Sequence, residues 1–312
     1  MVGHRSGVPH HASEQSTRAR RLPVVEPLTV VVRRGGVVES VHRVHAVAVQ
    51  EGEVIEAAGD PRLVCFFRSS AKPFQALPLA RAYDDLDPRE LAIASASHLA
   101  LPEQLAAVRR LLDRAAATED DLECGPQPTR LQHNCSGKHA GMLALCRARS
   151  WPFEGYRLAG HPVQEGCAAE IAAAAELEPS ATAVDGCGVV TFALPLERMA
   201  HAFGRLESLD AGDRVGSAMR THPELVRGPG APDTRLMQLL PGWTAKGGAE
   251  ALLCAASPDG VGIAIKVEDG GSRAVAPAAA AFLARLGNDP GDLASTPLRN
   301  SRDEVVGAVE VE

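Results

Sequence analysis

The chain has 312 residues, 45% of them hydrophobic, which is enough to bury a sizeable core as one large domain or two closely packed ones. A formal net charge of −7, with no arginine cluster interleaved with aromatic residues, argues against nucleic acid as a partner. No apolar run reaches the ~18 residues that a membrane helix needs, so we expect a soluble protein with no membrane segment.

The first 25 residues are polar and contain no apolar signal core, and we expect them to form a disordered tail. Residues 26–312 are expected to form a single α+β domain. Within it, residues 28–33 predict a strand, and residues 45–50 and 54–58 predict a hairpin. The seven cysteines are scattered and no export signal precedes them, which indicates reduced thiols and a cytoplasmic location.

The middle of the domain, roughly residues 73–240, is expected to be a mainly helical region. Pro73 is tolerated in the first turn of a helix, whereas Pro78 predicts an interruption. Apolar periodicity predicts helices over residues 89–96, 102–117, 137–148, 163–177, 196–206 and 213–220. Short strands are expected at residues 184 and 189–192.

The last part of the domain returns to strands. Residues 251–256 and 261–267 predict a hairpin around Pro258-Asp259-Gly260. A helix is expected over residues 273–286, and residues 305–311 predict an edge strand. Strands at both ends with helices between them predict an α+β protein whose antiparallel sheet joins the N- and C-terminal segments.

Lysine is scarce: the chain has four lysines, Lys72, Lys138, Lys246 and Lys266, against 28 arginines. Arginine can replace lysine wherever only positive charge is needed, but guanidinium does not lose its proton in a protein. A lysine retained in such a chain is therefore a candidate for proton transfer or metal ligation. Lys266 lies on an expected hairpin strand without a partner motif, and we expect it to be structural.

Ser69 and Lys72 are three residues apart, so on a helix their side chains lie on one face. A desolvated lysine near another positive charge can take a proton from a serine hydroxyl. A serine at a helix N-terminus also offers its backbone N–H to a developing oxyanion. This pair alone is suggestive of a serine nucleophile and no more.

Lys246-Gly247-Gly248 enters an expected strand, where the glycines allow a ligand or another backbone to approach closely. An ordinary turn before a hairpin is the alternative. With Ser97 as the middle element, these motifs resemble the Ser-x-x-Lys, Ser-x-Asn and Lys-Thr-Gly trio of the β-lactamases and penicillin-binding proteins.

Cys135-Ser136-Gly137-Lys138 and Asp185-Gly186-Cys187-Gly188 suggest a split metal site. Two thiolates far apart in sequence are no zinc signature by themselves, and spacing alone favours buried structural cysteines. Lysine would be an unusual ligand because it must bind as the neutral amine. His133 and His139 are more conventional ligand candidates nearby.

Several blocks together resemble the asparaginase II family, the rhizobial-type class 3 L-asparaginases. The match runs in order from about Arg34 to Ala274. The blocks are Arg68-Ser-Ser-Ala-Lys-Pro-Phe-Gln75, Ala96-Ser-His98, Asn134-Cys-Ser-Gly-Lys-His-Ala-Gly-Met-Leu143, Asp185-Gly-Cys-Gly, Thr191-Phe-Ala-Leu-Pro195 and Lys246-Gly-Gly-Ala-Glu250.

The resemblance implies a serine β-lactamase-like or penicillin-binding-protein-like fold and a catalytic domain that hydrolyses L-asparagine to L-aspartate and ammonia. It implies two serine–lysine tandems, Ser69 with Lys72 and Ser97 with Lys246. It also implies a Zn²⁺ ion bound by Cys135, Lys138 and Cys187 with water. The expected substrate contacts are Arg68, His98, Asp185, Ala249 and Arg273, for which structural ion pairs and a buried core histidine are the alternatives.

The chain departs from the family pattern at a few positions. After Ala96-Ser-His98 the resemblance leads us to expect a Gly-Glu pair and a second histidine, where this chain has Leu99-Ala100 and Gln104. We expect this change to alter a lip of the substrate pocket. Ala251 stands where a glycine is usual.

Other functions remain open on the residues alone. A glutaminase, a peptidase or a β-lactam hydrolase would use the same chemistry. An amino-acid or zinc sensor would bind without turnover, and a thiol-redox protein would form a reversible disulfide between Cys135 and Cys187. We also expect a homodimer that acts on a small-molecule substrate.

Overall fold

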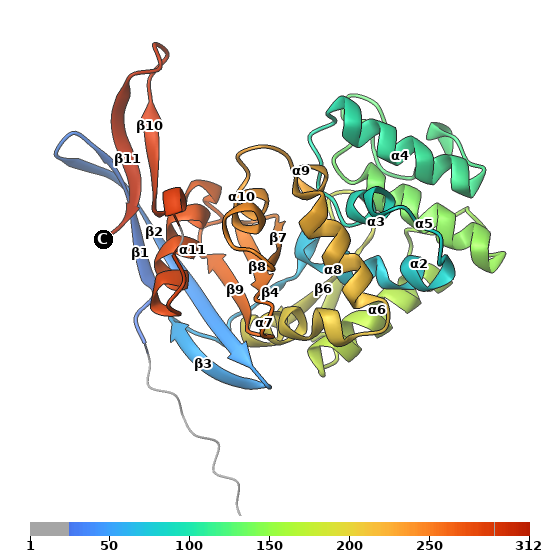
Figure 1. Ribbon diagram of the computed structural model, residues 1–312, viewed down its shortest axis with the longest axis horizontal. Coiled ribbons are helices and arrows are strands. Elements are labelled where there is room, and N and C mark those ends of the chain that lie inside the picture. The colour runs from blue at the N-terminus through green and yellow to red at the C-terminus, as the bar shows by residue number, and fades with distance from the viewer. Residues whose placement is uncertain (1–24, 290) are drawn as a thin grey trace, which may run out of the picture.

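The computed structural model describes residues 25–289 and 291–312. The predicted tail, residues 1–25, lies outside this range except for its last residue. In the described part, strands from both ends of the chain form a large sheet, and helices occupy most of the middle (Figure 1). No helix among the described residues is long and apolar enough to cross a membrane.

The strands and helices follow one another from a strand-rich start to a strand-rich end. The strands are β1 (Leu28–Arg34), β2 (Val37–Gln50), β3 (Glu53–Ala58), β4 (Val64–Phe66), β5 (Ala181–Val184), β6 (Val190–Pro195), β7 (Thr244–Gly248), β8 (Leu252–Ala256), β9 (Gly262–Val267), β10 (Ser295–Arg299) and β11 (Val305–Val311). The α-helices are α1 (Lys72–Gln75), α2 (Leu77–Ala82), α3 (Pro88–Ala94), α4 (Pro102–Ala115), α5 (Ser136–Arg149), α6 (Pro162–Ala175), α7 (Leu196–Arg205), α8 (Gly212–Thr221), α9 (Pro223–Val226), α10 (Pro232–Leu239) and α11 (Val275–Arg285). The short 3₁₀ helices are η1 (Arg68–Ala71), η2 (Glu119–Asp121), η3 (Leu206–Ser208), η4 (Ser272–Ala274) and η5 (Gly291–Ala294).

The large sheet has the strand order β10-β11-β1-β2-β9-β8-β7, and β3 also pairs with β2. All of its pairs are antiparallel. Val30 of β1 lies opposite Val311 on one side and His42 on the other, so the two ends of the chain meet inside the sheet. The predicted α+β fold, with an antiparallel sheet built from N- and C-terminal segments around a helical region, is confirmed.

One strand lies in a different place from the one the sequence predicted. Residues 305–311 were expected at the edge, but β11 lies between β1 and β10, and that prediction is wrong. The edge strand is β10, which carries Pro297 and is mostly exposed. Because β10 has no alternation of buried and exposed apolar residues, periodicity did not identify it.

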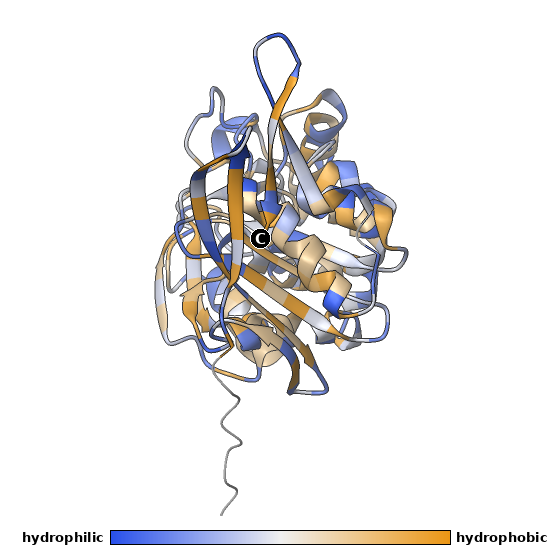
Figure 2. Cartoon of the chain, turned by 90° about the vertical axis from the view of Figure 1, so that its left-hand side faces the viewer, coloured by the Kyte–Doolittle hydropathy of each residue, from blue (hydrophilic) through white to orange (hydrophobic). Residues whose placement is uncertain are grey.

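The centre of the sheet is covered on both faces. All five residues of β8 are buried, although successive side chains of a strand point to opposite faces. Helices α7 and α11 pack against this part of the sheet. Figure 2, which looks onto the side of β1, β2 and β11, shows hydrophobic and hydrophilic segments mixed along the strands. A second, three-stranded sheet has the order β4-β6-β5.

The predicted helices are present, with ends that local backbone geometry fixes. Helix α1 ends at Gln75 and α2 begins at Leu77, so the interruption expected at Pro78 is confirmed. Helices α4, α5 and α6 each end at a residue with left-handed φ: Ala116 (50°), Ser150 (55°) and Glu176 (48°). This is a common way to end a helix, although glycine is the usual residue there.

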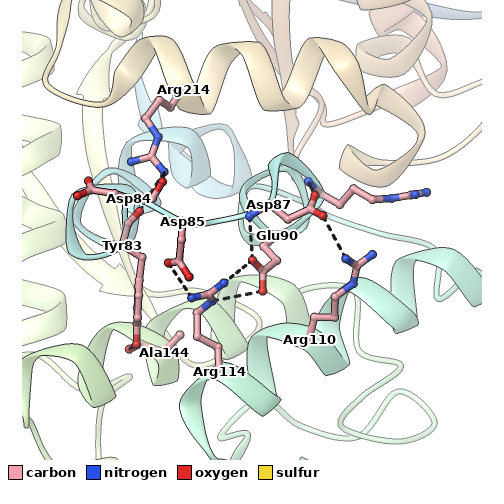
Figure 3. A network of polar contacts seen from close by, with 10 residues as sticks. Tyr83, Asp84, Asp85, Asp87, Glu90, Arg110, Arg114, Ala144 and Arg214 are labelled. Atoms are coloured by element: carbon pink, nitrogen blue, oxygen red, sulfur yellow. Dashed lines mark hydrogen bonds and ion pairs between the residues drawn. The ribbon is translucent and has the colours of Figure 1, made fainter.

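A polar network joins helices of the middle region (Figure 3). Arg114 of α4 pairs with Asp85 and with Glu90 of α3, and its guanidinium lies 4.9 Å from the centre of the Tyr83 ring. Arg214 of α8 donates hydrogen bonds to the carbonyl oxygens of Ala80, Tyr83 and Asp84. These contacts fix α3, α4 and α8 relative to one another.

Candidate active site

A cavity of about 530 Å³ lies beside β7, the last strand of the large sheet. Its lining residues come from η1, the segment after α3, the α9–α10 connection, β7, β8, η4 and the start of α11. Five of the predicted site residues line it: Ser69, Ser97, Lys246, Ala249 and Arg273. Segments far apart in the sequence thus bring both predicted serines and one predicted lysine to the same cavity.

Ser69 is held at this wall by its neighbour. The Ser70 hydroxyl donates to the carbonyl oxygen of Lys246 at 2.8 Å, which fixes η1 against β7. Gly248 allows this approach, because a Cβ atom there would lie 3.0 Å from Ser70 Oγ. The sequence therefore places a glycine where the serine-bearing turn and the strand must come close.

Lys72 is fully buried and its amine points to the second serine. Its Nζ donates to Ser97 Oγ at 2.9 Å and to the carbonyl oxygen of Ala96, and lies 3.3 Å from Cys135 Sγ. Ser69 and Lys72 keep their three-residue spacing across the junction of η1 and α1. Burial lowers the pKa of the Lys72 amine, and Lys138 acts in the same direction while Cys135 opposes it.

Lys246 is also fully buried, on β7. Its Nζ donates to the carbonyl oxygen of Gly247 at 2.7 Å and lies 3.5 Å from Asp233 Oδ2. Burial lowers the pKa of Lys246 to about 8; Lys72 also lowers it, and Asp233 partly offsets the effect. A group with such a pKa exchanges protons readily near neutral pH.

The three predicted metal ligands form a buried cluster beside Lys72. Lys138 Nζ lies 3.2 Å from Cys187 Sγ. The Cys135 thiol and the Lys138 ammonium lower the pKa of Cys187 to about 4, against the opposing effect of burial. Burial disfavours the charged form of Lys138, but Cys187, Cys135 and Asp185 raise its pKa above the ordinary range.

These side chains have the chemistry of a zinc site. Two thiols and one amine can supply three soft or borderline donors, and a fourth position can be left to water. Among the described residues, no group of three or more His, Cys, Asp and Glu side chains is arranged to hold a metal, so a metal here needs Lys138 as a ligand. Metal binding would then have to remove the Lys138 proton.

The two histidines considered as alternative ligands make other contacts. His133 Nδ1 accepts the backbone N–H of Cys135 at 3.0 Å. His139 Nδ1 lies 2.6 Å from the hydroxyl of Tyr156. Burial lowers the pKa of His139 well below its ordinary value.

Arg68 and Asp185 pair with each other and do not line the cavity. Arg68 Nε donates to Asp185 Oδ1 at 2.7 Å, and Arg68 has a left-handed φ of 49°. Burial raises the pKa of Asp185, but Lys138, the Gly186 N–H and Arg68 together hold it below its ordinary value. This pair therefore fixes the strained residue that precedes Ser69.

His98 is a buried residue with both ring nitrogens occupied. Its Nδ1 accepts the N–H of Ala100 at 3.1 Å, so Nε2 carries the proton and donates to Ser136 Oγ at 2.8 Å. Burial and the nearby Lys72 lower the pKa of His98 to about 3. The neutral ring lies outside the cavity lining, in the position of a structural histidine.

Arg273 of η4 lines the cavity, and its side chain is held by residues that lie outside the cavity lining. Its Nε donates to His42 Nε2 at 3.0 Å and its Nη2 to Ser40 Oγ at 3.0 Å. His42 Nδ1 in turn donates to Asp269 Oδ2 at 2.7 Å. This chain of contacts orients the Arg273 guanidinium at the cavity wall.

Two departures from the family pattern leave a mark on the backbone. Ala251 has a left-handed φ of 55° at the position where a glycine is usual, and Ala100, which stands where the glutamate of the Gly-Glu pair was expected, has a φ of 58°. Such conformations favour glycine, because a Cβ atom meets the backbone there. Leu99 of the same segment lines the cavity, as expected for a pocket lip.

The sequence reasoning missed Arg227, Asp233 and Asn134, which also line the cavity. Arg227 and Asp233 lie at the two ends of the segment Arg227-Gly-Pro-Gly-Ala-Pro-Asp233. Charged residues that flank a loop rich in glycine and proline indicate a binding loop, and this pattern can be seen in the sequence alone. Asn134 adjoins the predicted ligand Cys135.

Comparisons with known proteins bear on this arrangement. The family model described as L-asparaginase II matches residues 30–311. No curated protein matches the chain.

Solved structures give looser likenesses. They include Mglu in its native form (14% identity, 80% of this chain, 66% of that chain, TM-score 0.46) and Mglu in its tris and glutamate form (16%, 78%, 59%, 0.45). Another is the octameric penicillin-binding protein homologue from Pyrococcus abyssi (11%, 79%, 74%, 0.37). The chain spans less than two thirds of the length of each Mglu chain. With TM-scores below 0.5, these likenesses carry no argument about activity.

Proposed function

This chain belongs to the L-asparaginase II family, whose members are amidohydrolases, and we propose that it is an L-asparaginase. Its reaction would be hydrolysis of the side-chain amide of L-asparagine to L-aspartate and ammonia. One observation carries the proposal: two serines and Lys246 line one cavity, and the buried Lys72 donates to one of these serines.

The first step is attack of Ser69 Oγ on the side-chain amide carbon. Lys72 serves as the base, because burial lowers its pKa and so favours the neutral amine that can accept a proton. The oxyanion that forms is stabilised by backbone N–H groups of Ser69 and of the segment at Ala249.

The second step is departure of ammonia, which needs a proton. Ser97 contacts Lys72 at 2.9 Å, so it is suited to pass the proton toward the leaving nitrogen. Lys246 lines the same cavity, and in its charged form it would stabilise the negative charge that develops while this proton passes. Water then hydrolyses the aspartyl ester on Ser69, and the enzyme returns to its starting state.

Cys135, Lys138 and Cys187 are the residues that would hold a zinc ion, with water in the fourth position. A bound zinc ion would supply positive charge that orients the amino and carboxyl groups of the substrate or holds the pocket. Lys138 Nζ and Cys187 Sγ already lie 3.2 Å apart, as two ligands of one ion must.

A second assignment of the nucleophile has a specific observation in its favour. The hydroxyl that Lys72 contacts is that of Ser97, so Ser97 is a competing nucleophile for the same reaction. The asparagine analogue 5-diazo-4-oxo-L-norvaline alkylates active-site nucleophiles, and peptide mapping of the adduct separates the two. An adduct on Ser69 supports the proposal. An adduct on Ser97 would show that Ser97 is the nucleophile and leave Ser69 as the proton carrier.

The function itself is tested by ammonia release. The purified chain should release ammonia from L-asparagine faster than from L-glutamine or an asparaginyl peptide, and it should leave a chromogenic β-lactam intact. Faster release from glutamine would make it a glutaminase, and turnover of the β-lactam a β-lactam hydrolase. Binding of asparagine without turnover would make it a sensor.

We also propose that the protein is a cytoplasmic homodimer. All seven cysteines lie in the described part of the chain and all are free thiols, which is in keeping with a reducing compartment. Sedimentation velocity of the full chain tests the dimer, and a monomer at micromolar concentration would contradict it.

A further inference from the structure

The cavity carries more positive than negative charge. Its charged lining residues are Arg227, Lys246, Arg273 and a single carboxylate, Asp233. Asp233 Oδ2 lies 3.5 Å from Lys246 Nζ and also accepts the N–H of Gly247 at 2.9 Å. The negative charge of Asp233 is therefore paired with residues of β7. Two guanidinium groups remain, and a cavity with this balance suits an anionic ligand.

Arg227 is the guanidinium that contacts Ser97. Its Nη1 donates to the carbonyl oxygen of Ser97 at 2.7 Å. Its side chain is half-buried, and no carboxylate of a described residue lies within ion-pair distance of it. A guanidinium has five donors, so the others are free to bind a ligand.

The backbone of Arg227 is held in place by a buried glutamine. Gln104 Nε2 donates to the carbonyl oxygens of Arg227 (3.0 Å) and Glu224 (2.7 Å). Gln104 Oε1 accepts the N–H groups of Leu99 (2.9 Å) and Leu101 (3.0 Å). All four contacts join the loop that bears Arg227 to the segment that follows Ser97, so Arg227 is fixed relative to that serine before any ligand enters.

The other arginines near the site are less suited to this task. Arg68 is paired with Asp185 at 2.7 Å and lies outside the cavity lining. Arg273 lines the cavity, but it is exposed and its Nε and Nη2 are bound to His42 and Ser40. Arg227 alone combines free donors, a place in the wall and a direct contact with a reacting residue.

We infer that Arg227 binds the α-carboxylate of the substrate. This inference rests on the proposed function, which supplies an amino acid with its amide at the serines. A guanidinium and a carboxylate can form two parallel hydrogen bonds, which fix both the position and the orientation of the substrate. Arg227 would then select substrates that carry a carboxylate next to the scissile side chain.

The test compares L-asparagine with β-alaninamide, which is asparagine without its α-carboxylate. In the wild-type protein, kcat/KM should be higher for asparagine by roughly 10- to 100-fold, the usual worth of a charged hydrogen bond. Arg227→Gln should lower kcat/KM for asparagine by a similar factor and affect β-alaninamide much less. Arg227→Lys keeps the charge and loses the paired geometry, so its kcat/KM for asparagine should lie between those of the wild type and Arg227→Gln.

Arg214→Gln is the matched control. Arg214 is also half-buried and also donates to backbone carbonyls, but it lies in the helical network of Figure 3 and outside the cavity lining. This variant should leave the ratio of the two kcat/KM values unchanged. If Arg227→Gln lowers kcat/KM equally for both substrates, Arg227 acts only through its contact with the Ser97 carbonyl, and the inference is wrong.

A binding measurement tests the role of Arg227 without depending on turnover of asparagine. Calorimetry compares L-aspartate with β-alanine, which lacks the α-carboxylate, on the wild type and on Arg227→Gln. Aspartate should bind about 10- to 100-fold more weakly to the variant, while β-alanine binds to both alike. A wild type that binds aspartate through Arg227 and releases no ammonia refutes the proposed function and keeps the inference; unchanged aspartate affinity in the variant refutes the inference.

Discussion

The amine of Lys72 lies 2.9 Å from the hydroxyl oxygen of Ser97, which is 25 residues away in the chain. Ser69, only three residues from Lys72, lines the same cavity as Ser97. The Lys72 amine therefore contacts one of the two serines that line the cavity and, at 3.3 Å, the Cys135 sulfur. One buried amine thus connects the proposed proton carrier Ser97 with the proposed metal site.

Lys72→Arg should lower kcat for asparagine by roughly 10²–10⁴-fold, because guanidinium cannot accept a proton at working pH. Steady-state ammonia release measures the loss, and far-UV circular dichroism checks the fold. The matched control is Lys266→Arg, since the Lys266 amine contacts only the neighbouring Val267 carbonyl among the described residues. Wild-type turnover in Lys72→Arg would remove Lys72 from the role of base.

The pH dependence of kcat should report Lys246, which is proposed to act in its charged form. Burial lowers its pKa to about 8, so kcat should fall as the pH rises through about 8 and the amine loses its proton. Asp233 raises this pKa, so Asp233→Asn should move the falling limb to lower pH. The test is the profile of kcat between about pH 6 and 10 for the wild type and for Asp233→Asn. A falling limb at the same pH in both proteins contradicts the role of Lys246.

Zinc content should depend on Lys138. Lys138→Arg keeps the positive charge but cannot supply a neutral amine, so the variant should bind less than a tenth of the zinc held by the wild type. Elemental analysis after dialysis against zinc and then buffer measures this without any activity assay. Lys266→Arg is again the matched control, and a full complement of zinc in Lys138→Arg removes Lys138 from the ligand set.

Gly137 should be required for the packing of α5. A Cβ atom at this position would lie 2.2 Å from the carbonyl oxygen of Ile93, so Gly137→Ala should lower the free energy of unfolding by about 1–3 kcal/mol. Gly166 of α6 has no atom within 4 Å of its Cβ position, and Gly166→Ala should raise that free energy by about 0.5–1 kcal/mol. Urea denaturation compares the two variants, and equal effects would contradict the packing argument.

The sequence by itself determined the main elements of this protein. Apolar periodicity predicted helices such as α4 and α6, because buried and exposed residues recur at helical spacing along each segment. The hairpin of β8 and β9 was predicted from two apolar runs on either side of the turn at Pro258-Asp259-Gly260, although both strands are almost fully buried. The scarcity of lysine and the short motifs around Ser69, Cys135 and Lys246 led to the family, because such motifs are contiguous in the chain.

Only the tertiary structure decided which side chains meet. It placed Lys72 against Ser97, Lys246 beside Asp233, and Arg227 on the Ser97 carbonyl, none of which is close in sequence. It also put β11 inside the sheet, where periodicity had suggested an edge. Periodicity records whether a residue is buried and not which residue covers it, since the partner comes from a distant segment whose position depends on how the whole chain packs.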